Sequence, residues 1–196
     1  MPRAKQRTPE LRDHVLTVAL DLLEREGVAG FTTRALARRA TTSTPAVYEL
    51  FGDKTGVVRG LFFEGFRLLR RRLDALVDSA DPRRDLVSLV EIYRRFIVDN
   101  PVLAEVMFSR PFSDFRPSES EVEAGSSVRE FIVEHVRRCT DAGELAGDPT
   151  DVAHVLVALV QGLASAENAQ RLGTTRSSVD RRWALALRAL LDGLAP

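Results

Sequence analysis

Apolar residues recur at intervals of three and four along almost the whole chain. This spacing puts them on one face of an α-helix, whereas a half-buried strand needs strict alternation. The stretches 10–26, 84–100 and 122–142 follow it, and glycine or proline stands between most such stretches. Gly27 should end the first of them, and the Phe31 side chain just after it should lie in the core. The sequence therefore predicts an all-α fold with about nine helices in total.

Composition indicates an ordinary globular protein of a reducing compartment. Hydrophobic residues make up 44% and charged residues 29% of the 196 residues. Cys139 is the single cysteine, so no disulfide forms within the chain. The first residues lack the apolar core of a signal peptide, and no run of about 18 apolar residues is present. We expect a cytoplasmic protein with no membrane partner.

The segment 32–54 reads as two short helices joined by a tight turn. The hydroxyl of Thr32 or Thr33 can cap the first helix, and that of Ser43 or Thr44 can cap the second, because a hydroxyl accepts from an orphan N–H at a helix start. This pattern predicts a helix-turn-helix, whose second helix enters the DNA major groove. A pair of helices that only pack together, with a solvated polar face, is the alternative.

Charge is distributed unevenly along a chain whose net charge is zero. Residues 1–60 carry ten Lys and Arg against seven Asp and Glu, a net charge of +3. Residues 27–48 contain three arginines and no acidic residue. A local basic face on a neutral protein suits specific DNA binding with modest non-specific affinity. We therefore expect association with the nucleoid when the protein is bound to DNA.

Side-chain chemistry suggests which residues contact DNA. Hydroxyls reach phosphates or base edges, small apolar groups meet thymine methyls, and cations hold phosphates. The first helix of such a motif crosses the DNA backbone. The basic arm at the N-terminus is either a solvated terminus or a second contact. These arguments indicate Arg3, Lys5, Arg7, Arg34, Thr42, Ser43, Thr44, Pro45, Ala46, Tyr48 and Lys54.

Residues 10–66 also resemble the N-terminal domain of the TetR/AcrR family of transcriptional regulators. The resemblance is carried by Gly27, Phe31-Thr32-Thr33, Leu36-Ala37, Ala40, Ser43-x-Pro45-Ala46-Val47-Tyr48, Phe51 and Lys54. It adds Thr33 to the expected DNA contacts. Thr41-Thr42 replaces the usual Gly-Val of the turn, so the turn must form without glycine. Leu50 replaces a frequent His, which removes one polar group that could face the DNA backbone.

The resemblance implies two domains, a helix-turn-helix domain at 1–55 and a ligand-binding and dimerisation domain at 56–196. Fragments of the second, such as NPVLAEVMFSRPF and VALVQGLASAE, resemble the C-terminal domain of WHG-like type. Leu156 and Gln161-Gly162 stand where that type has a Trp and a His-Gly pair. The long helix predicted at 56–79 would link the two domains, with Val77 in its inward-facing apolar stripe and Arg70 to Arg72 on its solvated face.

A small apolar ligand is expected among inward-facing aromatic residues of the second domain. The alternative for each of these residues is an ordinary place in the hydrophobic core without ligand contact. Tyr93, His135 and Gln161 would supply polar contacts. The candidates are Phe62, Phe66, Tyr93, Phe96, Met107, Phe108, Phe112, Phe131, His135 and Gln161. His135 and Cys139 share a helix face but have no further ligand nearby in sequence, so we expect no metal and no other cofactor.

The segment 149–172 is apolar almost all round, which is typical of a helix buried in a large core or in a partner. Because the chain is small, a subunit interface is the better interpretation. Together with 176–194 it would form a four-helix contact between two copies. The residues expected there are Val155, Ala158, Leu159, Gly162, Ala166, Trp183, Leu187 and Leu190.

The sequence contains no glycine-rich phosphate loop, nucleophile elbow or zinc-ligand cluster, so we do not expect an enzyme. The favoured hypothesis is a homodimeric repressor that binds an inverted-repeat operator in double-stranded DNA and is released by a small-molecule effector. The second hypothesis is a DNA-binding protein without an inducer, whose C-terminal domain only dimerises or binds a protein. Activation instead of repression also stays open.

Overall fold

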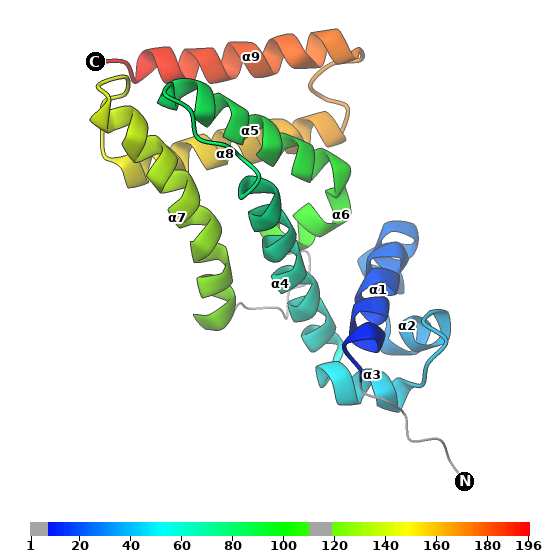
Figure 1. The fold of residues 1–196 in the computed structure, drawn as a ribbon. Helices are drawn as coiled ribbons and strands as arrows, with labels where there is room; N and C mark the ends of the chain where they lie inside the picture. Colours follow the sequence, from blue (N-terminus) through cyan, green and yellow to red (C-terminus); the bar gives the residue numbers. More distant parts are fainter. Residues whose placement is uncertain (1–7, 110–118) are drawn as a thin grey trace. The chain divides into compact units, whose positions relative to one another are not determined.

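The computed structural model describes residues 8–109 and 119–196, and this part of the chain is built from helices (Figure 1). It contains nine α-helices and one π-helical turn, with no strand among the described residues. The predicted all-α fold of about nine helices is therefore confirmed. Arg3, Lys5, Arg7 and Phe112 lie outside the described residues.

The chain divides into two compact units, which we describe separately. Unit 1 takes the chain up to Phe66 and the segment from Val102 to Val122. Unit 2 takes Arg67–Pro101 and Glu123–Pro196. The domain limits of 1–55 and 56–196 stay a prediction.

Unit 1 contains a three-helix group. Helix α1 (Pro9–Gly30) packs against α2 (Thr33–Arg39), and α2 packs against α3 (Thr44–Phe51). The predicted core position of Phe31 is confirmed, since its side chain is 1% exposed. The first part of α4 (Lys54–Leu73), most of α6 (Pro101–Ala104) and the π-turn η1 (Glu105–Ser109) complete the unit.

Gly27 interrupts α1 as the sequence predicts. Its φ of +65° lies in the left-handed region that favours glycine, so the regular helix stops there and one further turn follows up to Gly30. At the other end, the Thr8 hydroxyl accepts from the Leu11 N–H and caps the helix.

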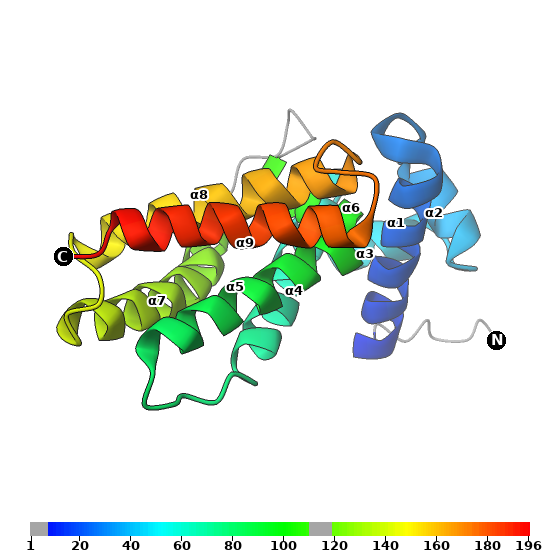
Figure 2. The same cartoon turned by 90° about the horizontal axis from the view of Figure 1, so that it is seen from above.

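Unit 2 is a bundle of long helices. Helix α5 (Pro82–Asp99) packs along α8 (Pro149–Asn168), and α8 lies beside α9 (Arg176–Gly193) in both views (Figures 1 and 2). Helix α7 (Glu119–Asp141) and the last part of α4 belong to the same bundle from residue 123 and residue 67 on. Asp81, Asp148 and Thr175 cap α5, α8 and α9.

The predicted helix at 56–79 ends earlier than expected. Helix α4 stops at Leu73, and Val77, expected to face inward, is 84% exposed. The polar residues after it favour a turn: Asp85 accepts from the backbone and the hydroxyl of Ser79, which fixes the connection to α5.

Two of the three arginines at the end of α4 bond residues of other helices in unit 2. Arg70 donates to Asp74 and to the carbonyl of Ser127 on α7. Arg72 donates to Asp99 on α5 at 2.8 Å. The prediction of a solvated basic face was therefore wrong for Arg70 and Arg72, which join helices within unit 2, whereas Arg71 is exposed.

Candidate nucleic-acid interface and ligand site

Side-chain caps define the helices of the motif in unit 1. Thr32 accepts from the Ala35 N–H at 3.1 Å and caps α2, and Ser43 accepts from the Ala46 N–H at 3.3 Å and caps α3. Of the predicted alternatives, the cap is therefore Thr32 rather than Thr33 for α2, and Ser43 rather than Thr44 for α3. Asp53 accepts from the Gly56 N–H at 2.7 Å and starts α4 in the same way.

The turn between α2 and α3 forms without glycine by placing a threonine in the left-handed region. Thr41 has φ +52°, and the N–H of Thr42 donates to the carbonyl of Ala37 at 2.9 Å. This is the Schellman arrangement, in which glycine usually takes the left-handed position. A β-branched residue there costs roughly 1–2 kcal/mol.

The exposed side of α3 carries polar and small residues. Pro45 and Tyr48 are exposed, the latter by 48%, and Thr42, Ser43 and Thr44 are half-buried at the helix start. The side chains that reach solvent at the beginning of a recognition helix are those that meet base edges and phosphates.

Ala46 corrects one expected DNA contact. Its side chain is only 4% exposed and packs in the core beside Val47, which is fully buried. A methyl group turned inward cannot meet a thymine methyl, so we leave Ala46 out of the proposed interface. The reason is helical geometry, since Ala46 shares the inward face with Val47 while Pro45 and Tyr48 point outward.

The arginines of α2 have different environments. Arg34 and Arg38 are exposed, whereas Arg39 donates to Asp21 at 3.0 Å and to Glu26 at 3.2 Å on α1. Arg39 is therefore already neutralised within the unit. Arg38 was not among the expected contacts, although its place beside Arg34 in the basic stretch of the sequence could have indicated it.

Helix α4 begins close to the end of α3. Lys54 lies with its ammonium 5.6 Å from the centre of the Phe31 ring, and Thr33 is half-buried at the start of α2. A Cβ on Gly56 would lie 1.6 Å from the carbonyl oxygen of Phe51, so only glycine fits there. The junction between α3 and α4 thus depends on one glycine.

The nine expected ligand-binding residues that the structure describes fall into separate groups, four in unit 1 and five in unit 2. In unit 1, the Phe66 ring lies 4.9 Å from that of Phe62 and 6.1 Å from that of Phe108. Met107 packs so close to α4 that a Cβ on Gly65 would be 2.3 Å from its sulfur. These side chains form a packed cluster.

In unit 2, the expected polar contacts already have partners. Gln161 donates to the Tyr93 hydroxyl at 3.0 Å, and burial raises the pKa of Tyr93 to about 12, although this hydrogen bond alone would lower it. Phe131 stacks on His135 at 4.4 Å, and the ring nitrogens of His135 lie 2.8 Å from the Phe131 carbonyl and 3.1 Å from Asp78. Phe96 is fully buried.

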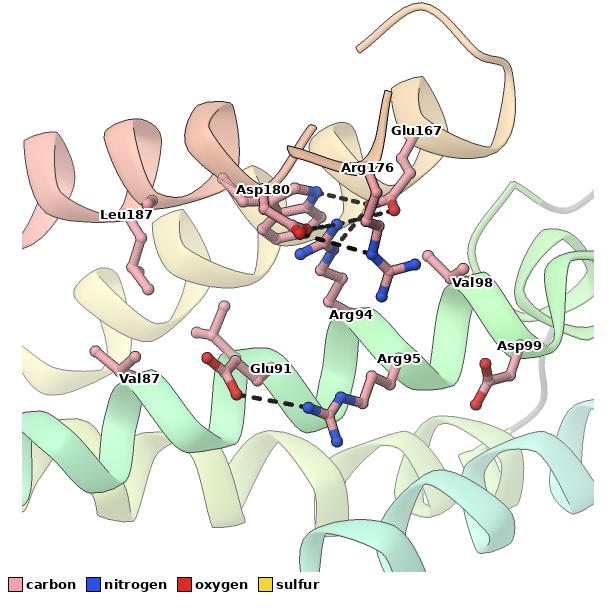
Figure 3. A pocket seen from close by; sticks show the side chains of 13 residues that line it. Val87, Glu91, Arg94, Arg95, Val98, Asp99, Glu167, Arg176, Asp180 and Leu187 are labelled. Carbon is pink, nitrogen blue, oxygen red and sulfur yellow. Dashed lines mark hydrogen bonds and ion pairs between the residues drawn. The ribbon is translucent and has the colours of Figure 1, made fainter. Parts of the chain in front are cut away.

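A pocket of about 370 Å³ lies instead between α5, α8 and α9 in unit 2 (Figure 3). None of the expected ligand residues lines it. Its walls combine apolar and charged side chains, namely Val87, Val90, Glu91, Arg94, Arg95, Val98, Asp99, Glu167, Arg176, Asp180, Trp183, Ala184 and Leu187.

An ion-pair network forms one wall of this pocket. Arg94 donates to both carboxylate oxygens of Glu167, at 2.8 and 2.9 Å, and to Asp180 at 2.8 Å. Its guanidinium also lies 4.8 Å from the Trp183 ring, whose Nε1 donates to Glu167 at 2.8 Å. Burial alone would lower the pKa of Arg94, but the two carboxylates outweigh it and raise that pKa.

No sequence pattern indicated this network. Arg94 and its two carboxylate partners are separated by 73 and 86 residues. Side-chain spacing within one helix carries no information about such partners, because the pairing depends on how α5, α8 and α9 pack together.

Trp183 corrects one expected subunit contact. Its side chain is 5% exposed and lies inside the protomer against Arg94 and Glu167. A side chain that is already buried has little surface to offer a second copy. Leu187 lies in the pocket wall, so it too has a place within the protomer.

One side of α8 is apolar and uncovered in unit 2. Val155 is 53% exposed, Ala158 and Gly162 are exposed, and Leu185 on α9 is 61% exposed. Helix α8 is long and apolar enough to cross a membrane, with a mean hydropathy of 1.2 and 28% of that stretch buried. One such helix is weak evidence for a membrane span, because helices of water-soluble proteins reach the same values.

Comparisons with known proteins identify the class. Residues 15–61 match the family described as bacterial regulatory proteins, tetR family, and residues 86–190 match the tetracyclin repressor-like C-terminal domain. Together with the capped helix-turn-helix, these matches define a DNA-binding transcriptional regulator of a type that often responds to ligands.

The chain belongs to the TetR family of bacterial regulators. It is 27% identical over 192 residues to the tetracycline repressor protein class C of Escherichia coli, covering 93% of this chain and 82% of that protein. It is 31% identical over 106 residues to the nucleoid occlusion factor SlmA of Aliivibrio fischeri, a match that spans about half of each protein, 53% and 54%.

Solved structures show the same fold. A protein of unknown function from Rhodococcus sp. RHA1 superposes with a TM-score of 0.82 at 27% identity, covering 99% of this chain and 100% of that one. The family assignment from the sequence is thereby confirmed, and the WHG-like type of the C-terminal domain stays a prediction.

Proposed function

We propose that the protein is a homodimeric repressor that binds an inverted-repeat operator and is released from it by a small, largely apolar ligand. The family supplies the coarse function, DNA-binding regulation of transcription. The observation that supports operator recognition is the motif in unit 1, whose second helix has Ser43 as its cap and Tyr48 at its exposed surface.

The proposed DNA interface combines three kinds of contact. Thr44 and Pro45 at the start of α3 meet base edges, while Tyr48, Lys54 and the exposed arginines of α2 hold phosphates. Arg3, Lys5, Arg7, Thr33, Thr42 and Ser43 complete it. Two copies would present their α3 helices to half-sites about 34–36 Å apart.

A glycine in the middle of α8 supports the proposed homodimer. Gly162 costs about 1 kcal/mol relative to alanine in a helix interior. Nothing among the described residues requires it, because a Cβ there would have no atom within 4 Å. Close approach of a second copy gives the glycine a reason. Ala158 and Val155, four and seven residues before it, lie on the same exposed face of α8.

A mass measurement in solution tests the homodimer. We expect a dimer at micromolar concentration. Val155→Asp should shift it toward the monomer because it buries an unpaired charge in the helix contact, and Gly162→Leu because its bulk keeps the helices apart. Val77→Asp is the matched control, since Val77 is 84% exposed outside the proposed interface. Dissociation by the control alone, or by none of the three, would contradict the proposal.

DNA binding by variants tests the assigned contacts. Tyr48→Phe and Lys54→Ala should weaken binding to all duplexes by a similar factor, about tenfold for Lys54, because they remove phosphate contacts. Changes at Thr44 or Pro45 should alter the preferred bases instead. Glu24→Gln, on the exposed side of α1, is the control. A uniform loss from every variant would contradict these separate roles.

The tetracycline repressor, a relative over most of this chain, supports release by a ligand. Bound ligand would favour a conformer whose half-site spacing no longer fits the operator, with a coupling of about 1–3 kcal/mol. Cytoplasmic localisation, with nucleoid association on binding, belongs to the same proposal.

A further inference from the structure

We infer that the pocket between α5, α8 and α9 binds a small amphipathic anion, a carboxylate with an apolar body, which competes with Asp180 for arginines of the pocket wall. The volume of about 370 Å³ falls within the range of roughly 300–1,000 Å³ usual for small-molecule sites. The inference adds a location and a chemical class to the proposed ligand response, and its binding test does not involve DNA.

Three of the four acidic groups of the pocket are already engaged, and the fourth, Glu91, is 63% exposed at the pocket rim. Glu167 accepts three hydrogen bonds, two from Arg94 and one from Trp183. Asp99 accepts from Arg72 at 2.8 Å, and Asp180 accepts from Arg94 at 2.8 Å. A cationic ligand at Glu167, Asp99 or Asp180 would therefore have to displace short hydrogen bonds that the protein already makes.

The arginines, in contrast, keep donors to spare. A guanidinium has five N–H groups, and Arg94 uses its Nε and Nη2, so Nη1 has no partner among the described residues. Arg176 comes no closer than 3.6 Å to Asp180, and Arg95 no closer than 3.9 Å to Glu91. Both are more than 70% exposed. A bound carboxylate could thus accept hydrogen bonds from guanidinium groups that make only long ion pairs within the protein.

The remaining wall suits an apolar body. Figure 3 shows Val87 on α5 and Leu187 on α9 at one end of the pocket and Val98 toward the other, with Arg94, Asp180 and Arg176 between them. Val90 and Ala184 also line the pocket. A ligand with one carboxylate and a short alkyl or aromatic body would bury its apolar surface along these side chains.

Asp180 acts in this arrangement as an internal stand-in for the ligand carboxylate. It is half-exposed and pairs with both Arg94 and Arg176. Replacing it by asparagine removes the competing charge and leaves the two cations, so it should strengthen binding of an anion. The same change would weaken binding of a cation. The sign of one substitution therefore separates the two classes.

Trp183 provides a direct signal, because it is the single tryptophan of the chain and lines the pocket. Its indole N–H gives one cross-peak in a ¹⁵N spectrum of the full chain, and its fluorescence can be titrated. The probes are octanoate, octan-1-ol and octylammonium, which share an alkyl body and differ in charge. We expect saturable shifts with octanoate and binding at least tenfold weaker for the other two.

Variants locate the site. Asp180→Asn should tighten octanoate binding severalfold, and Arg176→Gln should weaken it about tenfold. Arg176 is 77% exposed, so its replacement leaves folding intact. Arg181→Gln is the matched control on the same helix, outside the pocket, and should change the affinity less than twofold. Absence of any saturable shift, tighter binding of octylammonium, or weaker octanoate binding by Asp180→Asn would overturn the inference.

A final measurement distinguishes failure of this inference from failure of the proposed function. The affinity for a selected operator is measured with and without saturating octanoate. Loss of DNA affinity supports both. Binding to the pocket with unchanged DNA affinity supports the site and contradicts release from it, whereas no binding at the pocket overturns the site and leaves operator recognition to be judged by its own test.

Discussion

The helix-turn-helix of unit 1 and the α5–α8–α9 group of unit 2 are held together by different kinds of contact. In the motif, Thr32, Ser43 and Asp53 each bond a backbone N–H three residues away. In the helix group, Arg94 bonds carboxylates 73 and 86 residues away. The first region is specified locally, and the second only by packing of distant elements.

The largest expected effect comes from the distant network. Arg94→Ala leaves Glu167, which is 12% exposed, without its cation, and we expect a loss of about 3–5 kcal/mol in the free energy of unfolding. Arg95→Ala, one residue on and 73% exposed, should cost less than about 0.5 kcal/mol. Urea denaturation measures both. Equal effects would mean that the network is not what stabilises this region.

The next effect tests the motif. Gly56→Ala puts a Cβ on the Phe51 carbonyl oxygen, a backbone atom that cannot turn away, so we expect a loss of about 3 kcal/mol. In hydrogen exchange, the Gly56→Ala variant should lose protection in α3 relative to the unsubstituted protein, while protection in α8 stays the same. Gly193→Ala, where a Cβ meets nothing within 4 Å, is the control. Unchanged protection in α3 would contradict the tight junction.

A third effect concerns the loop before α5 and depends on pH. Burial alone would raise the pKa of Asp85, but hydrogen bonds from Ser79 and the ion pair with Arg138 lower it below its usual value. Its stabilising contribution is therefore present at neutral pH and is lost as the pH falls below about 4, the unfolded value, toward the lowered pKa.

Asp85→Asn should accordingly cost about 2 kcal/mol at pH 7. The difference from the unsubstituted protein should shrink at pH 3, where the carboxylate of the unfolded chain is mostly protonated. Denaturant titrations at the two pH values measure it. The exposed Asp74→Asn should cost less than about 0.5 kcal/mol, and a pH-independent cost for Asp85→Asn would refute the explanation.

The smallest effect is a gain. Thr41→Gly places glycine at φ +52° and should raise the free energy of unfolding by about 0.5–1 kcal/mol, since relief of strain exceeds the added freedom of the unfolded chain. Thr42→Gly, at a residue without positive φ, should only destabilise. Thermal melts distinguish the two, and a loss at Thr41 would mean that its side chain is needed in the turn.

This contrast explains which features the sequence could predict. The caps, the break at Gly27 and the inward position of Phe31 follow from local rules and were predictable. Helix periodicity also placed Val77 inside, which is wrong because Ser79 and Asp85 form a turn after α4.

The pocket and its network were beyond the reach of sequence patterns. Periodicity could tell that Trp183 faces inward but not that it meets Arg94 and Glu167 rather than a second copy. Conversely, Leu185 on α9 is 61% exposed, and sequence spacing alone did not mark it as a surface residue. Partners from different helices become apparent only once the bundle is assembled.

Selection of duplexes from a random-sequence DNA pool by the purified protein tests the central claim most directly. It should be done at fixed salt of about 0.15 M, because affinity depends steeply on ionic strength. The account predicts enrichment of an inverted repeat whose half-sites lie about one helical turn apart or slightly more. Enrichment of a single half-site, or of no sequence, would contradict a dimeric, sequence-specific regulator.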